Sequence, residues 1–500
     1  MRPRALTLTL SRKREGGAAG RARGQGFASA KGTREAEEGP RGPCAVVVSG
    51  KRKRDAIGRL RGPAVLAAVW LLAPAAPSAA SVTVSIQPLP LAGEVGAAAP
   101  GEGATPPPPA AFAGALDDDT DVVLFPAARR PTSRPVVTVA TRVRGTPSAV
   151  GAVLLDPNRY RAALPSLVRA DVVATRAGSL PSVGPDRLLA WELEIPLFNL
   201  KGKAWLTRQA DVIELTLVEG AFAPGHVRFR MAPADGGRAT ILVSEAQLEP
   251  RSANWIFRRV AGHDPWSETA MTAAAAMVLA RAVALEVAVP HQAGRGPARP
   301  EGPMTAPAAA TLDGSTLAGP TFRGLRKAGV VATIHRTRRG RLAHVSAAVS
   351  IAGNPTEVAA RVDAPESWTA FPGWKSVTRL APPQRQDELK ITVEDDVAFV
   401  DLDATWDVKY GPSAGATVIA GATKGAVLQW QVFPAPPSGL PGQAALAVLS
   451  EQPRLDESGY VARKMIESEP LMEHALALAL TYADVAAMAD RIDPGRASSK

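Results

Sequence analysis

The chain has 500 residues and a formal net charge of +11, but this charge is confined to the segment 1–62. Residues 1–62 hold 16 Lys and Arg against 5 Asp and Glu, so the rest of the chain carries 42 charges of each sign. A protein that binds the phosphate backbone needs a basic surface on its folded part, which excludes nucleic acid as a partner. The single cysteine, Cys44, and six scattered histidines form no ligand motif, so neither a metal nor a cofactor is expected.

The segment 1–80 has the composition of a leader. A basic stretch at 51–61 precedes ten apolar residues at 64–73, and small residues at 78–80 form a cleavage site before Ser81. Ten apolar residues are too few to span a bilayer. We therefore expect a basic leader at 1–62, whose start is either misassigned or a genuine N-terminal arm, and a signal-peptide hydrophobic region at 63–80. The expected destination is the periplasm or cell envelope, and the alternative is an uncleaved N-terminal anchor.

After the leader, the composition predicts a spacer and then a first domain. Residues 81–134 are rich in Ala, Pro and Gly and are expected to be disordered. Within the first domain, residues 135–290, Pro147 and Pro157 open short helices, and residues 267–289 form one long apolar helix. Because this helix has no other apolar partner in the sequence, we expect the sheet to wrap around it. Alternating segments predict antiparallel strands with one buried face at 136–144, 168–175, 187–197, 202–211, 212–219, 227–231 and 239–248.

A linker is expected at 291–340, and residues 341–492 repeat the first domain. When Val137 to Ala162 is aligned with 345–370, 8 of 26 positions are identical. Further on, Trp205 aligns with Trp406 and Gly220 with Gly425. A period of about 200 residues is the length of a whole domain plus a linker, so we expect two superposable domains, each with its own sheet. The second domain has strands predicted at 343–352, 388–393, 398–410, 416–423, 427–433 and 444–449, and helices at 460–466 and 471–492.

Several short motifs accompany this order of elements: PSAV at 147–150, LDPNRY at 155–160, LPS at 164–166 and WIFRR at 255–259. Together they resemble the START-like (SRPBCC, helix-grip) superfamily, in particular the polyketide cyclase and coenzyme Q-binding START-domain group, in tandem. The resemblance implies an α+β fold of two helix-grip domains, each a curved antiparallel sheet wrapped around a long C-terminal helix. It also implies an apolar cavity that holds a lipid, a quinone or a polyketide-like molecule.

An apolar interior is the candidate site, because the sequence has no nucleophile elbow, phosphate loop or zinc motif. Alanines on the long helix leave space against the sheet unless large strand side chains fill it. We therefore expect binding or carriage of a hydrophobic small molecule without catalysis. The alternatives are a polyketide cyclase or aromatase-type enzyme that uses Thr207 and Arg208, and a non-catalytic envelope scaffold with solid cores. The side chains expected to line the interior are Trp191, Trp205, Phe229, Trp255, Met271, Ala275, Val278 and Ala282.

Two further expectations concern particular parts of the chain. Trp255 and Phe257 beside Arg258 and Arg259 suit a pocket lid or a peripheral membrane contact, and the alternative is a hinge packed on its own domain. The first domain is expected to bind ligand more tightly than the second, because it keeps the 155–160 motif and a helix face of small residues.

Overall fold

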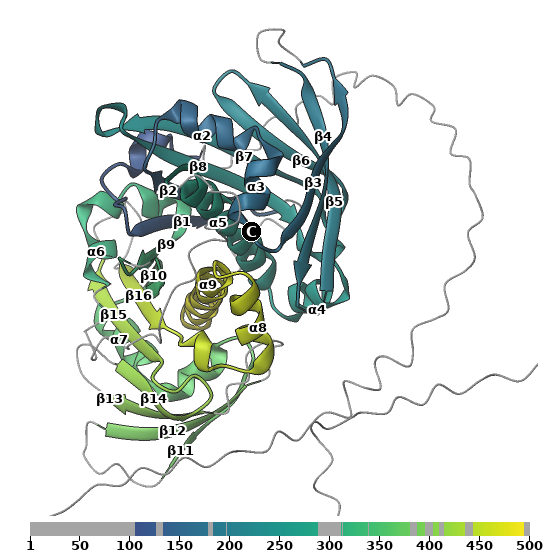
Figure 1. Ribbon diagram of the computed structural model, residues 1–500. Coiled ribbons are helices and arrows are strands. Elements are labelled where there is room, and N and C mark those ends of the chain that lie inside the picture. The colour runs from purple at the N-terminus through teal and green to yellow at the C-terminus, as the bar shows by residue number, and fades with distance from the viewer. Residues whose placement is uncertain are drawn as a thin grey trace, which may run out of the picture. The chain divides into compact units, whose positions relative to one another are not determined.

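The computed structural model describes residues 106–126, 134–178, 184–196, 198–288, 312, 314–338, 340–380, 388–395, 404–409, 415–435 and 444–494. These residues belong to one compact unit, residues 96–500, shown in Figure 1. The predicted leader, signal segment and cleavage site lie outside the described residues.

The first half of the unit consists of antiparallel strands, short helices and a long final helix. Its strands are β1 (Thr120–Pro126), β2 (Val137–Val143), β3 (Leu167–Arg176), β4 (Asp186–Ile195), β5 (Phe198–Gln209), β6 (Val212–Gly220), β7 (Phe222–Ala234) and β8 (Ala239–Glu249). Its helices are α2 (Pro147–Leu154), α3 (Pro157–Ala163), α4 (Trp255–His263) and α5 (Ser267–Ala288), with short 3-10 turns η1 (Pro109–Phe112), η3 (Asp235–Gly237) and η4 (Pro250–Ser252).

The second half repeats this sequence of elements. Its strands are β9 (Gly329–Arg336), β10 (Leu342–Ala352), β11 (Trp374–Arg379), β12 (Glu388–Asp395), β13 (Ala404–Lys409), β14 (Gly415–Gly421), β15 (Val427–Pro434) and β16 (Ala444–Gln452). Its helices are α6 (Ser315–Ala318), α7 (Pro355–Val362), α8 (Tyr460–Ser468) and α9 (Met472–Ile492), with 3-10 turns η5 (Pro320–Phe322), η6 (Leu325–Ala328), η7 (Pro365–Ala370) and η8 (Leu455–Glu457).

All the described strands belong to one antiparallel sheet, which runs β11-β12-β13-β14-β15-β16-β10-β9-β1-β2-β8-β7-β6-β5-β4-β3. The order within each half is the same, because β3 to β8 followed by β2 corresponds to β11 to β16 followed by β10. The halves are joined where β1 pairs with β9, from Thr120 opposite His335 to Pro126 opposite Gly329. The two repeats therefore do not have separate sheets, contrary to the expectation. The chain repeats its strand order inside one continuous sheet.

The joining strands lie in segments that the composition assigned to a spacer and a linker. β1 falls within 81–134 and β9 within 291–340, so the described parts of these segments are ordered, contrary to the prediction. The physical reason is burial on both faces of β1. Val123 and Phe125 enter the core on the helix side of the sheet, whereas Val122 and Leu124 pack on the opposite face. There the sheet is covered by side chains from η1, α6, η5 and η6, namely Phe112, Leu317, Phe322 and Leu325.

The long helix α5 has an apolar partner that the sequence did not reveal. It contacts β2 and β8 of its own half and also packs against α9 of the second half. The ring of Phe125 stacks on that of Tyr482 from α9, with centroids 3.7 Å apart. The premise that α5 has no apolar partner other than the sheet is therefore incorrect, because α9 is such a partner. Length and composition alone would allow α5 to cross a membrane, but its position between the sheet, α2, α3 and α9 explains why it is apolar on most sides.

The repeat extends to local geometry. Thr146 and Asn354 cap α2 and α7 through side-chain oxygens that accept hydrogen bonds from backbone N–H groups, and each helix has proline in its first turn. Gly220 and Gly425 have the same left-handed backbone, with φ of 85°. A Cβ at Gly220 would come 2.2 Å from the carbonyl oxygen of Lys201, so this turn requires glycine.

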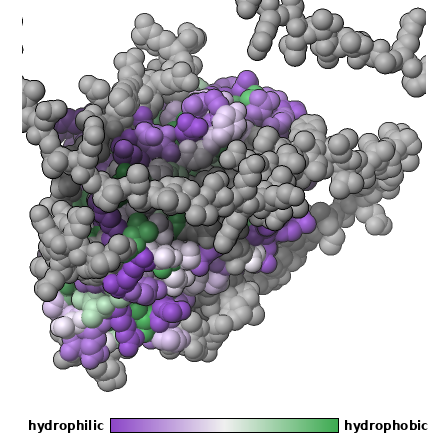
Figure 2. All heavy atoms as spheres, turned by 90° about the horizontal axis from the view of Figure 1, so that it is seen from below, coloured by the Kyte–Doolittle hydropathy of each residue, from purple (hydrophilic) through white to green (hydrophobic). Residues whose placement is uncertain are grey.

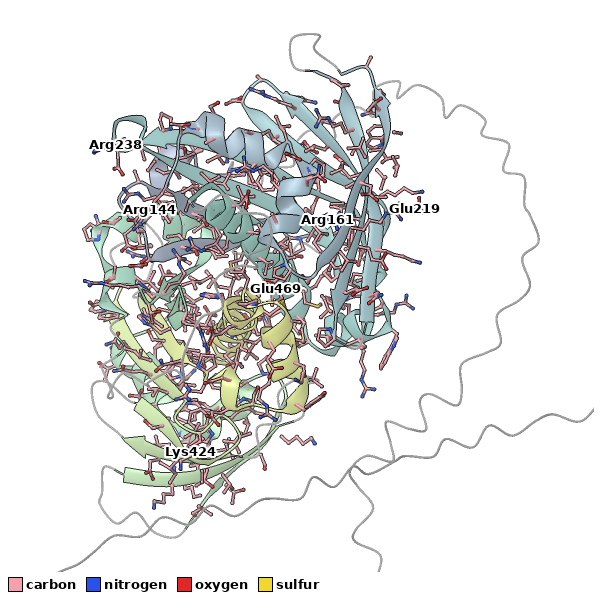
Figure 3. All side chains as sticks on the ribbon, viewed as in Figure 1. Arg144, Arg161, Glu219, Arg238, Lys424 and Glu469 are labelled. Carbon is pink, nitrogen blue, oxygen red and sulfur yellow. The ribbon has the colours of Figure 1, made fainter. Side chains whose placement is uncertain are left out.

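Buried polar contacts connect the two halves. Arg336 forms an ion pair with Asp121, and the side chains of both residues are 1% exposed. The same guanidinium donates a 2.9 Å hydrogen bond to the carbonyl oxygen of Asp118. At a second point Ser166 Oγ donates to Glu469 Oε2 at 2.9 Å, and Figure 3 shows Glu469 in the middle of the unit. Because such groups are costly to bury unpaired, these contacts hold the halves in one arrangement.

Candidate functional site

The helix-facing side of the first-half sheet is lined by apolar side chains in the predicted alternation. On β4, Leu189, Trp191 and Leu193 belong to the core or pack against it. Trp191 lies opposite Gly202 in the register of β4 and β5. A Cβ at Gly202 would come 2.9 Å from Cζ2 of Trp191, so the glycine makes room for the indole. Trp191 therefore lies on the face where it was expected.

This apolar face is not uniformly sealed. Phe229 on β7 has no exposed surface, as expected for the centre of the core. Trp191, Leu193, Leu215 and Met231 pack against the same core but are only half-buried. Solvent thus reaches apolar side chains on the helix-facing side of β4, β6 and β7. The first half has accessible apolar surface on the face where a ligand was predicted.

Trp205 does not line this interior. Its neighbours Ala204 and Leu206 are buried in the core, so the alternation of β5 directs Trp205 to the opposite face. There the guanidinium of Arg176 lies 4.2 Å from the ring centroid, a cation–π contact. Trp406, its counterpart in the sequence repeat, is 5% exposed and belongs to the core. The two tryptophans are therefore on different faces of the sheet.

Trp255 does not line the interior either. It is the first residue of α4 and 64% exposed. The inward aromatic residue of this helix is Phe257, which meets Phe222 edge to face at 5.6 Å and 85°. The prediction that Trp255 lines the ligand site is incorrect, whereas Phe257 of the same segment packs on its own half.

The four helix residues predicted to face the sheet divide between different surroundings. Ala275 and Val278 are half-buried and pack against the core, whereas Met271 is half-buried and outside it. Ala282 is fully buried but packs with Ala163 and Leu164 of its own half and with Leu471 of the second half. Since α5 is enclosed on several sides, its apolar pattern could not show which residues face the sheet. The α5 residues fully buried in the main core are Ala270, Ala273, Ala276, Met277, Ala280, Val283 and Ala284.

Two polar side chains beside this interior, Tyr160 and Arg187, are engaged in holding the end of α2. The hydroxyl of Tyr160 donates to the carbonyl oxygen of Leu154 at 2.7 Å, and burial raises the pKa of Tyr160. Arg187 donates to the carbonyl oxygen of Leu155 at 3.0 Å. These bonds satisfy the carbonyls that the end of a helix leaves without partners. Neither group is available as a general acid or base.

The two residues considered for cyclase chemistry are not placed for it. Arg208 is exposed near the end of β5, and its Nε donates to the carbonyl oxygen of Ala210 at 3.4 Å. Thr207 follows the buried Leu206 and so faces away from the core. Catalysis by Thr207 and Arg208 in the interior therefore has no structural support.

A polar group that the sequence did not single out faces the first-half core. Ser244 on β8 lies in register between Val139 and Phe229, both of which are core residues. Its side chain is fully buried, and its hydroxyl has no hydrogen-bond partner among the described residues. A buried hydroxyl without a partner is unusual. No sequence signal marks this residue, because one serine in a strand is common.

The corresponding region of the second half is filled with aromatic side chains. Phe371 lies 4.9 Å from Trp374 and 6.4 Å from Trp430 between ring centroids. Trp368 and Trp406 extend the cluster through contacts with Trp374. All five side chains are buried. The second half therefore has a densely packed aromatic core.

Sheet register and the sequence repeat show what occupies equivalent positions. Val139 corresponds to Ala347 in the sequence repeat. Val139 pairs with Ser244, which pairs with Phe229, whereas Ala347 pairs with Leu449, which pairs with Trp430. Ser244 therefore corresponds to Leu449, and Phe229 to Trp430. In the aligned segments after α2 and α7, Tyr160 corresponds to Trp368, Leu164 to Phe371 and Leu167 to Trp374. At five of these six positions the first half has the smaller side chain, and the exception is Val139, which is larger than Ala347.

The second half also buries a carboxyl pair. Glu451 on β16 is hydrogen-bonded to Thr481 and Asp484 of α9. Burial raises the pKa of Glu451 to about 7, although the two hydrogen bonds act in the opposite direction. The register places Ala246 at the equivalent position of the first half. The first half therefore has no acidic group at this position.

An open depression of about 480 Å³ lies elsewhere, on the second half. It is lined mostly by small polar or short side chains from β11 to β14, including Ser376, Thr378, Thr392 and Thr405. The hydroxyl residues alternate with the core residues Val377, Ile391 and Trp406, so they lie on the face away from the helices. Figure 2 shows a face where hydrophilic residues predominate among the described atoms.

Within the described residues no group of three His, Cys, Asp or Glu could hold a metal ion.

No protein-family model matches the chain, and a search of curated proteins gives no match. Similar solved structures include the di-domain ARO/CYC protein StfQ of the steffimycin biosynthetic pathway, 12% identical over 70% of this chain and 99% of its own, with a TM-score of 0.23. The Zhui aromatase/cyclase from Streptomyces sp. R1128 is 15% identical over 32% of this chain and 98% of its own, with a TM-score of 0.26. A START superfamily protein from Mycobacterium smegmatis is 19% identical over 31% and 97%, with a TM-score of 0.24.

These structures belong to the START-like group that the sequence resembles. The chain itself is an α+β protein with a large antiparallel sheet and a few helices. Folds of this kind support many unrelated activities, so function has to come from the site.

Proposed function

We propose that the first half binds a hydrophobic small molecule between its sheet and α5, and that the second half is a filled structural partner. The observation that carries this proposal is the difference at equivalent positions. Where the second half has Trp368, Trp374 and Trp430, the first half has Tyr160, Leu167 and Phe229. Two halves with the same strand order thus place different side-chain volumes at equivalent positions, and the first half also has half-buried apolar residues such as Trp191 and Met231 against its core.

The chemistry of the interior favours an amphiphilic ligand with one long apolar part. Burial of about ten methylenes contributes roughly 8 kcal/mol, at about 0.8 kcal/mol each. Association costs at least about 4 kcal/mol of this, which leaves binding reversible. The hydroxyl of Ser244 would orient a polar end of the ligand, because the first-half interior otherwise presents apolar side chains. The proposed activity is carriage or sensing without a chemical step.

A Leu167→Trp variant tests this proposal, because it gives the first half the tryptophan that the second half has at Trp374. If the interior is open, the larger side chain fills it, so uptake of a lipophilic fluorescent probe is lost while the melting temperature stays near that of the wild type. Probe titration and thermal unfolding of the same full-length protein provide both measurements. Leu188→Trp is the matched control, because Leu188 lies on the other face of the sheet in register with Trp205.

A solid first-half core predicts a different result. Overpacking then costs about 1–3 kcal/mol of stability in Leu167→Trp, and the wild-type protein takes up no probe. That combination would contradict the carrier proposal and favour the scaffold alternative.

We also propose that the protein is exported to the periplasm or cell envelope, on the basis of the basic stretch, the apolar segment and the small residues at 78–80. Protein recovered from the envelope is expected to begin near Ser81, which N-terminal sequencing will show. Retention of residues 64–80 would mean that the protein is anchored instead.

A further inference from the structure

Each half carries a short helix directly before its long helix, and each of these short helices begins with an exposed aromatic side chain. Trp255 opens α4 and is 64% exposed, and Tyr460 opens α8 and is 65% exposed. The two positions correspond in the repeat, since each is the first residue of the helix that precedes the long one. Large aromatic side chains are normally buried at least in part, so two such exposures at one repeated position call for an explanation.

Two basic residues follow each aromatic residue at the same spacing. Arg258 and Arg259 follow Trp255 by three and four positions, as Arg463 and Lys464 follow Tyr460. These spacings place one side chain of each pair about one helical turn from the aromatic residue. The intervening positions differ in size, since Phe257 corresponds to Ala462. What both copies retain is the exposed combination of one aromatic and two basic residues.

The core does not require this combination. On α4 the inward contact is made by Phe257, whose ring meets Phe222. On α8 the buried residues are Ala462 and Met465. The occurrence of this combination at the same position in both halves favours a role in binding over one in packing. Trp255 itself is not packed against the interior, since it is 64% exposed.

The two helices differ in charge. α4 contains no acidic residue, and the nearby Arg251 is paired with Glu268 at 3.5 Å, so the positive charge of α4 comes from Arg258 and Arg259. On α8, Lys464 forms an ion pair with Glu467 and lies 5.8 Å from the ring centroid of Tyr460. The basic side chains of α4 therefore retain more of their positive charge for an external partner.

We propose that α4 and α8 are membrane-contact helices that dock on a bilayer containing anionic lipids. Indole and phenol rings favour the boundary between lipid headgroups and acyl chains. Arginine and lysine beside them bind headgroup phosphates, which gives the charge complementarity. The part of the chain after residue 62 has no net charge, so attraction to the bilayer comes from these local groups. The inference does not depend on the proposed ligand site.

Sedimentation of the full chain with vesicles of phosphatidylcholine containing about one-third phosphatidylglycerol tests the contact. Near a membrane each basic residue contributes about fivefold to affinity, so Arg258→Gln with Arg259→Gln is expected to weaken binding by about 25-fold at low ionic strength. Arg463→Gln with Lys464→Gln is expected to have a smaller effect, because Glu467 already neutralises Lys464. Lys201→Gln with Arg208→Gln is the matched control, since it removes the same charge from exposed positions on β5.

Insertion of Trp255 into the bilayer is measured separately, by a signal that the basic leader cannot produce. The fluorescence difference between wild type and Trp255→Phe isolates Trp255, and vesicles with brominated acyl chains are expected to quench it. Leu167→Trp is expected to bind vesicles normally, which separates this inference from the ligand proposal. Equal vesicle binding by the α4 double variant and its control would overturn the inference, as would a Trp255 signal that brominated lipid does not quench.

Discussion

Asp121→Ala is expected to lower the free energy of unfolding by about 3–5 kcal/mol, because it leaves the Arg336 guanidinium buried without its carboxylate partner. The ion pair lies where β1 meets β9, so its loss weakens the junction between the halves. Urea denaturation of the full chain, followed by far-UV circular dichroism, measures the change. Some loss of cooperativity is also expected, since the halves are then held together less firmly.

Two comparisons make this result specific. Asp171→Ala removes one partner of the Arg169–Asp171 pair, whose side chains are about half exposed, and is expected to cost less than about 1 kcal/mol. Replacing both buried partners, Asp121→Leu with Arg336→Met, is expected to recover most of the lost stability. A cost below about 1 kcal/mol for Asp121→Ala would show that the junction does not depend on this pair.

Glu451→Gln is expected to stabilise the protein at pH 8 by about 3 kcal/mol, but only weakly near pH 5. Burial raises the pKa of Glu451 from its usual 4.5 to about 7, and each pKa unit corresponds to about 1.4 kcal/mol. Between pH 4.5 and about pH 7 the folded state binds more protons than the unfolded state, so the stability of the protein falls as pH rises. The penalty is absent below pH 4.5 and complete above pH 7. Glutamine removes the ionisation and keeps a donor for Asp484.

Thermal unfolding of wild type and Glu451→Gln across pH 5–8 measures this dependence. Glu219→Gln is the control, because Glu219 is exposed near the end of β6 and paired with Lys203. A difference between wild type and Glu451→Gln that stays constant with pH would show that the carboxyl pair does not hold a proton in the folded protein.

Alternation of apolar and polar residues predicted most of the strands closely. β8 was expected at 239–248 and runs from Ala239 to Glu249, and the long helix expected at 267–289 is α5, Ser267–Ala288. Both elements present one consistent periodicity over many residues, which is the strongest local signal in a sequence. The repeat also indicated correctly that the strand order occurs twice.

The predictions from sequence failed where contacts between distant segments of the chain determine the structure. β1 and β9 were placed in linkers, because a short strand buried on both faces has no alternation to mark it. On β5 the run Ala204, Trp205, Leu206 is apolar at every position, so the sequence does not show which residues face the core. The structure buries Ala204 and Leu206 and turns Trp205 to Arg176. For α5 the missing information was α9, a partner from the other half of the chain.

The candidate site was predictable as a region and less so as a set of residues. Trp191 and Phe229 are on the expected face, and Ala275 and Val278 pack against the same core. The buried hydroxyl of Ser244 was not predictable, because its surroundings depend on the register of three strands. The contrast between the two halves was also not predictable, because the sequence does not show that the tryptophans of the second half face inward.

The number of apolar molecules that one chain binds tests the central claim most directly. Native mass spectrometry of the full chain, titrated with a long-chain fatty alcohol, counts them without a fluorescent label. A single molecule per chain is expected for the wild type and none for Leu167→Trp, because the first half is open and the second is filled by its aromatic cluster. Two molecules per chain, or one that persists in Leu167→Trp, would contradict the account.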